Sequence, residues 1–449
     1  MTEMKRTESV ASEAAILVGV LLDGRSSSEF PLHELEGLAE TAGVRVVGQL
    51  TQRREVPDKT TYLGKGKVEE LQRMAEAADA DVVIFDNDLS PAQTRNLEKA
   101  TSVKVLDRTE LILDIFASRA QTYEARLAVE LAQLQYSLPR LKQMWNHLSR
   151  LKMGIGMRGP GEKQLEVDRR LVEKRIHDLG SELKVIQRRK ERQVAARSDR
   201  MTVSLVGYTN AGKSTLLNVL TGSDVLAEDK LFATLDTRTR RWQLPGWGPV
   251  LLSDTVGFIR DLPHHLIASF KATLEEARQA NLLLHVADAS NPAATDQITA
   301  VYGVLEEIGI QAKDTLLVLN KVDRVERGIV DQLLARYPNA VPISARRGTG
   351  LPQLAGAVSQ ALSRDFMDVD LEMGVENGRV MAFLAAHGEV LSKRYTGERV
   401  VVHCRISAED LGKIGDRSVK VKPHQNGYAP VGEDPLLAGG AAPAVGEVA

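Results

Sequence analysis

The stretch Gly207-Tyr208-Thr209-Asn210-Ala211-Gly212-Lys213-Ser214 decides the fold. It follows the apolar run 203–206 and precedes the helix-like run 215–220, which is the strand–loop–helix context of a phosphate-binding loop, or P-loop. Glycines let backbone N–H groups turn inward and hold phosphate oxygens at the amino end of a helix. We expect Lys213 to reach the β- and γ-phosphates and Ser214 to ligate Mg²⁺. A structural glycine turn is the alternative for this match taken alone.

A second motif predicts the base that the site selects. Asn320-Lys321-Val322-Asp323 follows an apolar run, as the base-recognition motif of a Ras-like domain does. The Asp323 carboxylate accepts hydrogen bonds from N1 and N2 of guanine, a donor pair that adenine lacks. After one more strand-like run, Ser344-Ala345-Arg346 completes the site through a backbone N–H to the guanine O6. These ordered motifs predict a GTP-binding, GTP-hydrolysing P-loop domain of the Ras-like class.

The stretches between these motifs predict the Mg²⁺ and switch residues. Asp254-Thr255-Val256-Gly257 follows an apolar strand, which places its aspartate to hold Mg²⁺ through water and its glycine N–H to sense the γ-phosphate. Phe232-Ala233-Thr234-Leu235-Asp236-Thr237 lies where a switch loop belongs, and a switch threonine ligates Mg²⁺ only when the γ-phosphate is present. The composition leaves Thr234, Thr237 and Thr239 open for this role.

Phe258 stands directly after Gly257, where many such enzymes place a glutamine that orients the attacking water. A phenyl ring cannot do this, so we expect slow intrinsic hydrolysis that a partner or another residue completes. Arg238, Arg240 and Arg260 are candidates for an arginine finger, and the sequence does not choose among them.

The composition is that of an ordinary globular protein. The chain has 449 residues with a formal net charge of −2, and length of this order predicts about three domains. Its one cysteine, Cys404, excludes a disulfide framework and fits a reducing cytoplasm. The polar start, residues 1–12, lacks a signal-peptide core, and no apolar stretch is long enough to span a bilayer. We therefore expect a cytoplasmic protein.

Short apolar, β-branched runs alternate with helix-like stretches in two regions, which is typical of parallel sheets in α/β domains. Between them lie two heptad-spaced seams, Leu127 to Leu148 and Val172 to Ile186, separated by a glycine-rich stretch that cannot be helical throughout. They predict a long antiparallel helical hairpin with residues 154–161 at its tip, and Pro139 should kink the first arm or mark its start. Near the C-terminus, 378–391 is helix-like and 399–403 is strand-like.

The predicted fold is therefore α/β, with a Ras-like P-loop GTPase domain and three accessory parts. The expected boundaries are a disordered N-terminus (1–13), an N-terminal α/β domain (14–120), the helical hairpin (121–198), the GTPase domain (199–365), a small C-terminal α+β domain (366–424) and a disordered tail (425–449). In the N-terminal domain, Ser90 followed by Pro91 predicts a helix start. The stretch 64–67, Gly-Lys-Gly-Lys, invites a second nucleotide site, although RNA contact or a helix-opening turn fits its spacing better.

The chain resembles the HflX GTPases over nearly its whole length. The motifs that carry the resemblance, beside the P-loop and Asp-Thr-Val-Gly-Phe, are Tyr62-Leu63-Gly64-Lys65-Gly66-Lys67, Asp86-Asn87-Asp88-Leu89-Ser90-Pro91, Asp107-Arg108-Thr109, Phe232-Ala233-Thr234-Leu235-Asp236 and Arg158-Gly159-Pro160-Gly161-Glu162. The resemblance implies that Thr234 is the switch ligand to Mg²⁺, which gives Lys213, Thr234 and Gly257 as the expected catalytic set.

The resemblance also implies a ribosomal partner. Members of the family bind the large ribosomal subunit, with the hairpin tip in the peptidyl-transferase region, and split stalled ribosomes, notably under heat stress. In this chain Arg158, Gly159 and Lys163 are the implied RNA contacts, although Lys163 stands where the family tends to have threonine. Residues 140–163 carry six Lys or Arg against one acid, and residues 184–200 seven against two. Such asymmetry is typical of a phosphate-binding surface, and a solvated helix face explains it equally well without the resemblance.

Two other functions remain open on the sequence. Another ribosome-linked or tRNA-modifying GTPase would share the nucleotide site without the hairpin, and a non-catalytic RNA-binding switch would use GTP only for affinity. We expect a monomer without a membrane span, and peripheral membrane association is left open.

Overall fold

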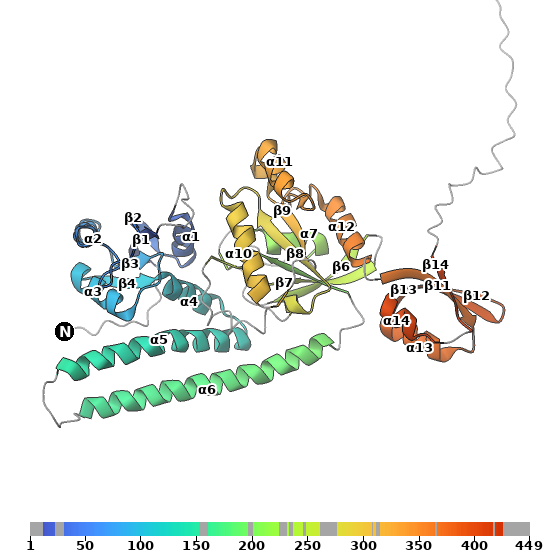
Figure 1. Ribbon diagram of the computed structural model, residues 1–449, viewed down its shortest axis with the longest axis horizontal. Helices are drawn as coiled ribbons and strands as arrows, with labels where there is room; N and C mark the ends of the chain where they lie inside the picture. The colour runs from blue at the N-terminus through green and yellow to red at the C-terminus, as the bar shows by residue number, and fades with distance from the viewer. Residues whose placement is uncertain are drawn as a thin grey trace, which may run out of the picture. The chain divides into compact units, whose positions relative to one another are not determined.

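The computed structural model describes residues 12–22, 31–151, 160–195, 201–223, 231–232, 237–245, 248–260, 276–307, 309–310, 315–363, 366–415 and 418–424. The chain divides into two compact units, Met1–Leu362 and Ser363–Ala449, each described by itself (Figure 1). The first unit holds the N-terminal domain, the helical hairpin and the GTPase domain. The predicted disordered tail, the hairpin tip at 154–159 and all but two residues of the predicted disordered N-terminus lie outside the described residues.

The N-terminal domain is a four-stranded parallel sheet in the order β2-β1-β3-β4, with helices on both faces. Its elements are β1 (Ala14–Leu22), α1 (His33–Thr41), β2 (Arg45–Arg54), α2 (Lys65–Ala77), β3 (Val82–Phe85), α3 (Pro91–Thr101), β4 (Lys104–Asp107) and α4 (Arg108–Arg119). Strand β1 is buried on both sides: Leu17 packs with α1 and α4, and Ile16 with α2 and α3. This two-sided burial explains why the strands read as continuous apolar runs.

Two helix starts in this domain follow from their sequences. Ser90 caps α3 through a capping box with Gln93, and Pro91 takes the first helical position, as predicted. Gly64 precedes Lys65, the first residue of α2, so the Gly-Lys-Gly-Lys stretch is a helix-opening turn.

The two heptad seams meet in a helical hairpin of α5 (Tyr123–Leu151) and α6 (Pro160–Ala195). Leu127, Leu131 and Leu179 are buried against each other, with the partly buried Leu134 and Ile176 beside them. Ion pairs flank this seam: Arg175 with Glu130 at 2.7 Å, and Lys190 with Glu124 at 2.8 Å. Helix α5 runs through Pro139, so the prediction that this proline could mark the start of the arm is wrong.

The GTPase domain is built on a six-stranded sheet in the order β10-β9-β8-β5-β7-β6. Its elements are β5 (Thr202–Gly207), α7 (Lys213–Thr221), β6 (Arg238–Leu244), β7 (Gly248–Asp254), β8 (Leu282–Asp288), α10 (Ala294–Glu307), β9 (Thr315–Asn320), the 3-10 turn η2 (Val322–Arg324), α11 (Arg327–Arg336), β10 (Val341–Pro342) and α12 (Leu351–Ser363). All pairs are parallel except β6–β7, which places the carboxyl ends of β5, β8 and β9 at one edge. The sequence did not predict β6, because four of its seven residues are charged or amidic and only Trp242 and Leu244 are buried.

The second unit is an antiparallel sheet in the order β12-β13-β11-β14. Its elements are β11 (Phe366–Gly374), α13 (Gly378–His387), β12 (Gly388–Thr396), β13 (Arg399–Ser407), α14 (Ala408–Lys413) and β14 (Lys420–Pro423). One face forms the core with the two helices, and Cys404 is buried there. The predicted helix over 378–391 is too long: Gly388 adopts an extended conformation that ends α13, and the chain continues as β12. Among the described residues, no helix is both long and apolar enough to cross a membrane.

Candidate nucleotide-binding site

The P-loop connects the end of β5 at Gly207 with the start of α7 at Lys213. Gly212 has a φ of +90°, and a Cβ there would lie 2.3 Å from Nδ2 of Asn320. Only glycine fits both the backbone angle and the space. The Asn320 side chain itself donates from Nδ2 to the Ala211 carbonyl at 2.9 Å, so the P-loop and the base motif are joined directly.

Lys213 lies buried beneath the loop. Its Nζ donates to the carbonyl oxygens of Gly207 at 3.1 Å and Tyr208 at 2.9 Å. Burial lowers the pKa of the Lys213 ammonium to about 8, and the nearby Asp254 carboxylate opposes this shift. A buried ammonium that donates to carbonyl oxygens is suited to bind an anionic phosphate, because the added negative charge stabilises the protonated form.

The Asp254-Thr255-Val256-Gly257 motif packs against the P-loop. Ser214 Oγ donates to Oδ2 of Asp254 at 2.6 Å, which places a hydroxyl and a carboxylate together at the start of α7. A Cβ on Gly257 would lie 2.8 Å from Cα of Thr209 and 3.2 Å from Nζ of Lys213. Glycine is therefore required at this close approach, which leaves the Gly257 backbone beside the Lys213 ammonium.

The predicted base-site residues also come together. Asp323 Oδ1 accepts a hydrogen bond from Ser344 Oγ at 2.6 Å, and this bond holds the pKa of the Asp323 carboxyl below its usual range. Ala345 N donates to Oδ1 of Asn320 at 3.0 Å. Lys321 Nζ donates to the Asn210 carbonyl at 2.8 Å. Strand ends that are far apart in the sequence thus form one site with an ionised carboxylate in it.

The structure describes the predicted switch loop only in part. Phe232 is buried, donates from its backbone N to Thr209 Oγ1 at 2.8 Å and packs edge-on against Phe116 of α4. Residues 233–236, which include Thr234, lie outside the described residues. The two alternatives are engaged elsewhere, because Thr237 and Thr239 donate to the Glu276 carboxylate at 3.2 and 3.4 Å.

Phe258 faces the protein interior. It is 3% exposed and belongs to the core cluster that also contains Phe232 and Phe116. Its backbone exchanges hydrogen bonds with the P-loop: Thr209 N donates to its carbonyl at 2.7 Å, and its N–H donates to the Gly207 carbonyl at 3.1 Å. The phenyl ring is thus used for packing and does not replace a water-orienting side chain.

One site residue was missed by sequence reasoning. Asp288, the last residue of β8, forms an ion pair with Lys321 Nζ at 2.7 Å. The available signal was its place at the carboxyl end of a strand, on the same edge of the sheet as Gly207 and Asn320.

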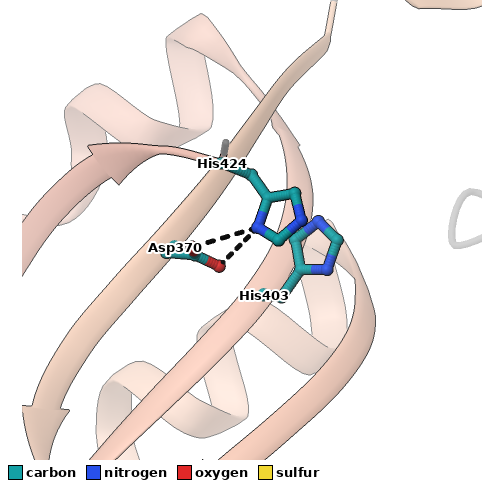
Figure 2. Close-up of side chains that lie close together, drawn as sticks. All are labelled: Asp370, His403 and His424. Atoms are coloured by element: carbon teal, nitrogen blue, oxygen red, sulfur yellow. Dashed lines mark hydrogen bonds and ion pairs between the residues drawn. The ribbon is translucent and has the colours of Figure 1, made fainter. Parts of the chain in front are cut away.

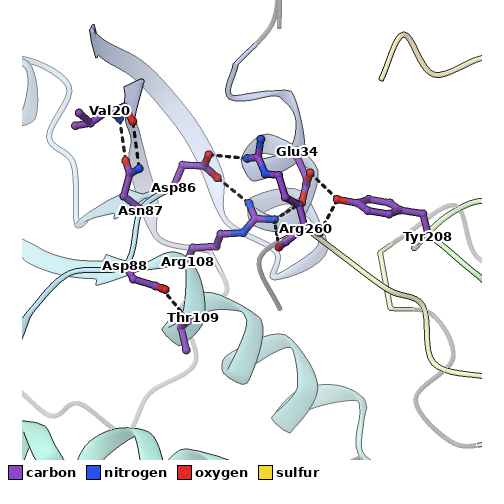
Figure 3. Close-up of polar contacts among 9 residues, drawn as sticks. All are labelled: Val20, Glu34, Asp86, Asn87, Asp88, Arg108, Thr109, Tyr208 and Arg260. Atoms are coloured by element: carbon purple, nitrogen blue, oxygen red, sulfur yellow. Dashed lines mark hydrogen bonds and ion pairs between the residues drawn. The ribbon is translucent and has the colours of Figure 1, made fainter. Parts of the chain in front are cut away.

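A polar network joins the P-loop to the N-terminal domain (Figure 3). Tyr208 OH donates to Glu34 Oε2 of α1 at 2.8 Å and accepts from Arg260 N at 2.7 Å. The buried Arg108 donates to Glu34 and, at 2.7 Å, to Asp86 Oδ1. Arg260 Nη2 pairs with Asp86 Oδ2 at 3.0 Å, so it is engaged here and not poised as a finger toward the P-loop. Burial raises the pKa of the Tyr208 hydroxyl, which therefore remains a hydrogen-bond donor.

The same region explains two of the family motifs. Besides the Asp86–Arg108 pair, Thr109 Oγ1 donates to Asp88 Oδ1 at 2.7 Å, and Asn87 exchanges two hydrogen bonds with the Val20 backbone (Figure 3). The Asp86 and Asp107 segments end adjacent parallel strands, which brings their side chains to one edge of the sheet. These residues thus lock the N-terminal sheet together and present Arg108 to the GTPase domain.

The sequence matches three family models and curated relatives over most of its length. The model of the family described as GTP-binding GTPase N-terminal matches residues 29–117, GTP-binding GTPase Middle Region matches 119–197, and 50S ribosome-binding GTPase matches 202–321. The chain is 44% identical to a GTPase HflX of Lacrimispora saccharolytica over 93% of this chain and 99% of that protein. It is 48% identical to the GTPase HflX of Escherichia coli over 82% of this chain and 88% of that protein. A crystal structure of a GTP-binding protein from Sulfolobus solfataricus with GDP is similar at 25% identity, covering 78% of this chain and 99% of that one, with a TM-score of 0.41.

Three motifs lie at one edge of a mainly parallel sheet: the P-loop, Asp254–Gly257 and Asn320–Asp323. They define the protein as a P-loop GTPase, an enzyme that binds guanine nucleotides and hydrolyses GTP. Within this class, the chain belongs to the HflX family.

Proposed function

We propose that GTP lies on the P-loop with each predicted residue in its sequence-assigned role. Lys213 contacts the β- and γ-phosphates, the Gly257 N–H senses the γ-phosphate, and Asp323 reads guanine. The support is geometric: Lys213 and the Gly257 backbone lie side by side, and Asp323 is held as an ionised carboxylate by Ser344. The other proposed nucleotide contacts are Gly207 to Gly212, Phe232 to Asp236, Asn320 to Val322 and Ser344 to Arg346.

We further propose that the reaction uses Mg²⁺, held by Ser214 and Thr234 directly and by Asp254 through water. The donor set fits this ion, because Mg²⁺ prefers hard oxygen ligands and keeps several waters. Ser214 Oγ and Asp254 Oδ2, 2.6 Å apart, already bring such a pair together at the phosphate-binding end of α7. The ion would neutralise charge on the phosphates, while the protein groups fix their position.

The proposed target is the large ribosomal subunit. The observation that carries this proposal is the match of residues 202–321 to the family described as 50S ribosome-binding GTPase. The charge of the hairpin supports an RNA partner, since Lys184, Arg188 and Arg189 of α6 are exposed. We place the RNA contacts at Arg158, Gly159 and Lys163.

By family resemblance, we propose that GTP-dependent binding splits or rescues stalled ribosomes under stress, in the cytoplasm and as a monomer. The long hairpin supports this role, because two helices packed along a leucine seam form a stiff arm that can carry a contact far from the nucleotide.

The test is cosedimentation of the full chain with separated small and large subunits, with GTP, a non-hydrolysable GTP analogue or GDP. We expect pelleting with large subunits in the two triphosphate states and not with GDP. Pelleting with small subunits, or with neither, would contradict the proposed target while leaving the nucleotide site intact. Binding that requires GTP without any turnover would favour the non-catalytic switch.

A further inference from the structure

The second unit has one sheet face that carries charged side chains and imidazoles instead of apolar groups. Along β11, Val369, Leu371 and Met373 point into the core, so Asp368, Asp370 and Glu372 point to the opposite face. Strand β13 alternates in the same way, with Cys404 in the core and His403 opposite Asp370. Helices α13 and α14 contribute to the core side.

Three of these side chains converge from three strands. Asp370 comes from β11, His403 from β13, and His424 directly follows β14. One ligand atom from each lies within 4.8 Å of the others. His424 Nδ1 is 3.0 Å from both carboxylate oxygens of Asp370, and the two imidazole rings stack with their centroids 3.5 Å apart and their planes at 11° (Figure 2).

We propose that Asp370, His403 and His424 bind a first-row divalent transition-metal ion, with Zn²⁺ as the representative ion. Two imidazole nitrogens and one carboxylate oxygen are a common ligand set for such ions, and water completes the coordination. Ligand atoms around tetrahedral Zn²⁺ are roughly 3.3 Å apart, given bonds of about 2.0 Å. The three ligand atoms lie within 4.8 Å of one another, so side-chain rotation would have to draw them together for this coordination.

A further carboxylate orients one of the ligands. Asp368 Oδ1 is 2.6 Å from Nε2 of His403, which leaves the other ring nitrogen for the metal. A histidine held between a carboxylate and a metal is a recurrent arrangement that fixes the tautomer and the ring orientation. Cys404 follows His403 in the chain but is buried on the core face, so the site contains nitrogen and oxygen ligands without sulfur.

The competing explanation is a ladder of polar contacts across the exposed face, in which His403 pairs with Asp368 and His424 with Asp370 and no ion is bound. Metal binding instead uses both rings in the neutral form and leaves the carboxylates to balance the charge of the ion. A ladder does not require Asp370, His403 and His424 to converge from three strands, and the convergence of their ligand atoms within 4.8 Å carries the proposal.

The site has a structural consequence for the edge of the sheet. Strand β14 has four residues, all exposed, and pairs only with β11 among the described strands. His424 is attached to β11 by one backbone hydrogen bond, from its N to the Asp368 carbonyl at 2.9 Å. A metal bridging His424 to β13 across β11 would fasten this short edge strand.

The test is titration of the nucleotide-free full chain with Zn²⁺ by calorimetry, and with Co²⁺ by visible absorption. The variants are His403→Gln, His424→Gln and Asp370→Asn, and His177→Gln, an exposed residue of α6, is the matched control. We expect one site in the wild type and the control, weakened at least about tenfold in each of the three variants. A far-ultraviolet circular dichroism spectrum and a thermal unfolding curve equal to those of the wild type would show that each variant is folded, including its second unit.

Two results would overturn the proposal. If folded variants bind Zn²⁺ as tightly as the wild type, or the wild type binds none, the cluster is a ladder of polar contacts only. If the Co²⁺ complex shows a thiolate charge-transfer band, Cys404 is a ligand and the proposed set is wrong. Neither result affects the GTPase assignment.

Discussion

Replacing Asp323 with asparagine should change which base the site selects. The Asp323 carboxylate is held in place by Ser344 Oγ at 2.6 Å and kept ionised by this bond. An asparagine keeps one oxygen that can accept hydrogen bonds from the serine and from guanine N1. Its NH2 group, however, faces the guanine N2 amine, and because both groups are donors no hydrogen bond forms between them. Hydrogen bonds to a charged group contribute about 1.5–3 kcal/mol each, so losing one weakens GTP binding by about tenfold to a hundredfold.

Xanthine carries a carbonyl oxygen where guanine has its N2 amine. The amide introduced at position 323 can donate a hydrogen bond to this oxygen. We therefore expect the ratio of GTP to XTP affinity to fall by at least the same factor. The assay is displacement of a fluorescent guanine nucleotide from purified protein by GTP and by XTP. Asp331→Asn, at an exposed acid of α11, is the matched control and should bind both nucleotides as the wild type does.

An unchanged preference for GTP in the folded Asp323→Asn protein would refute the assignment of this residue to the base site. A loss of both nucleotides together with a lowered melting temperature would show that the Ser344 contact has a structural role, and it would count equally against the proposed reason for selectivity.

The other predictions concern the phosphates, the core and the hairpin tip. Lys213→Ala should weaken GTP binding by tenfold or more, since it removes charged hydrogen bonds to phosphate, and equal affinity by fluorescence titration would reject its role. Burial lowers the pKa of His285 to about 3, so below about pH 6.5 the unfolded chain binds a proton that the folded chain does not. The free energy of unfolding should therefore fall as the pH is lowered from about 6.5 towards 3, and His285→Phe should show a shallower decline in denaturant unfolding over that range. Arg158→Ala and Gly159→Val should weaken binding to large subunits and leave nucleotide affinity within about twofold, because distant sites rarely couple by more than about 0.5 kcal/mol. In cosedimentation across a salt series, the affinity of Arg158→Ala for large subunits should fall less steeply with salt concentration than that of the wild type. If the variant with both substitutions binds large subunits as the wild type does, the tip only connects the two helices.

Local signals predicted much of the fold correctly. The apolar runs that became β1 and β5 are buried on both faces, so their pattern was continuous and clear. The leucine seams of the hairpin needed only spacing, because each helix buries one stripe against the other.

The elements that the sequence missed depend on partners. Strand β6 exists because it pairs antiparallel with β7 at the edge of the sheet, which no local pattern shows. The helix predicted to reach residue 391 ends at His387 because the following residues pair with β13 instead. In both cases pairing between strands determined the structure more than local propensity did.

The candidate site was likewise predictable where it depends on local motifs and unpredictable where it depends on contacts between distant segments. The motifs predicted which residues of the P-loop and the base motif come together, because their chemistry fixes both residue type and spacing. The Tyr208–Glu34 contact could not be predicted, since its partners are separated by 174 residues and each is ordinary in its own segment. Arg260 was a finger candidate on the sequence, and only the ion pair with Asp86 shows where it is held.

The most direct test of the central claim is phosphate release from GTP with and without purified large ribosomal subunits, at fixed enzyme and saturating Mg²⁺, with Lys213→Ala as the inactive control. Because Phe258 is buried in the core and offers no water-orienting group, basal turnover should be slow and large subunits should accelerate it, whereas small subunits should not. A fast basal rate that large subunits leave unchanged would contradict this account, since the catalytic site would then be complete within the chain and the ribosome would not be its activator.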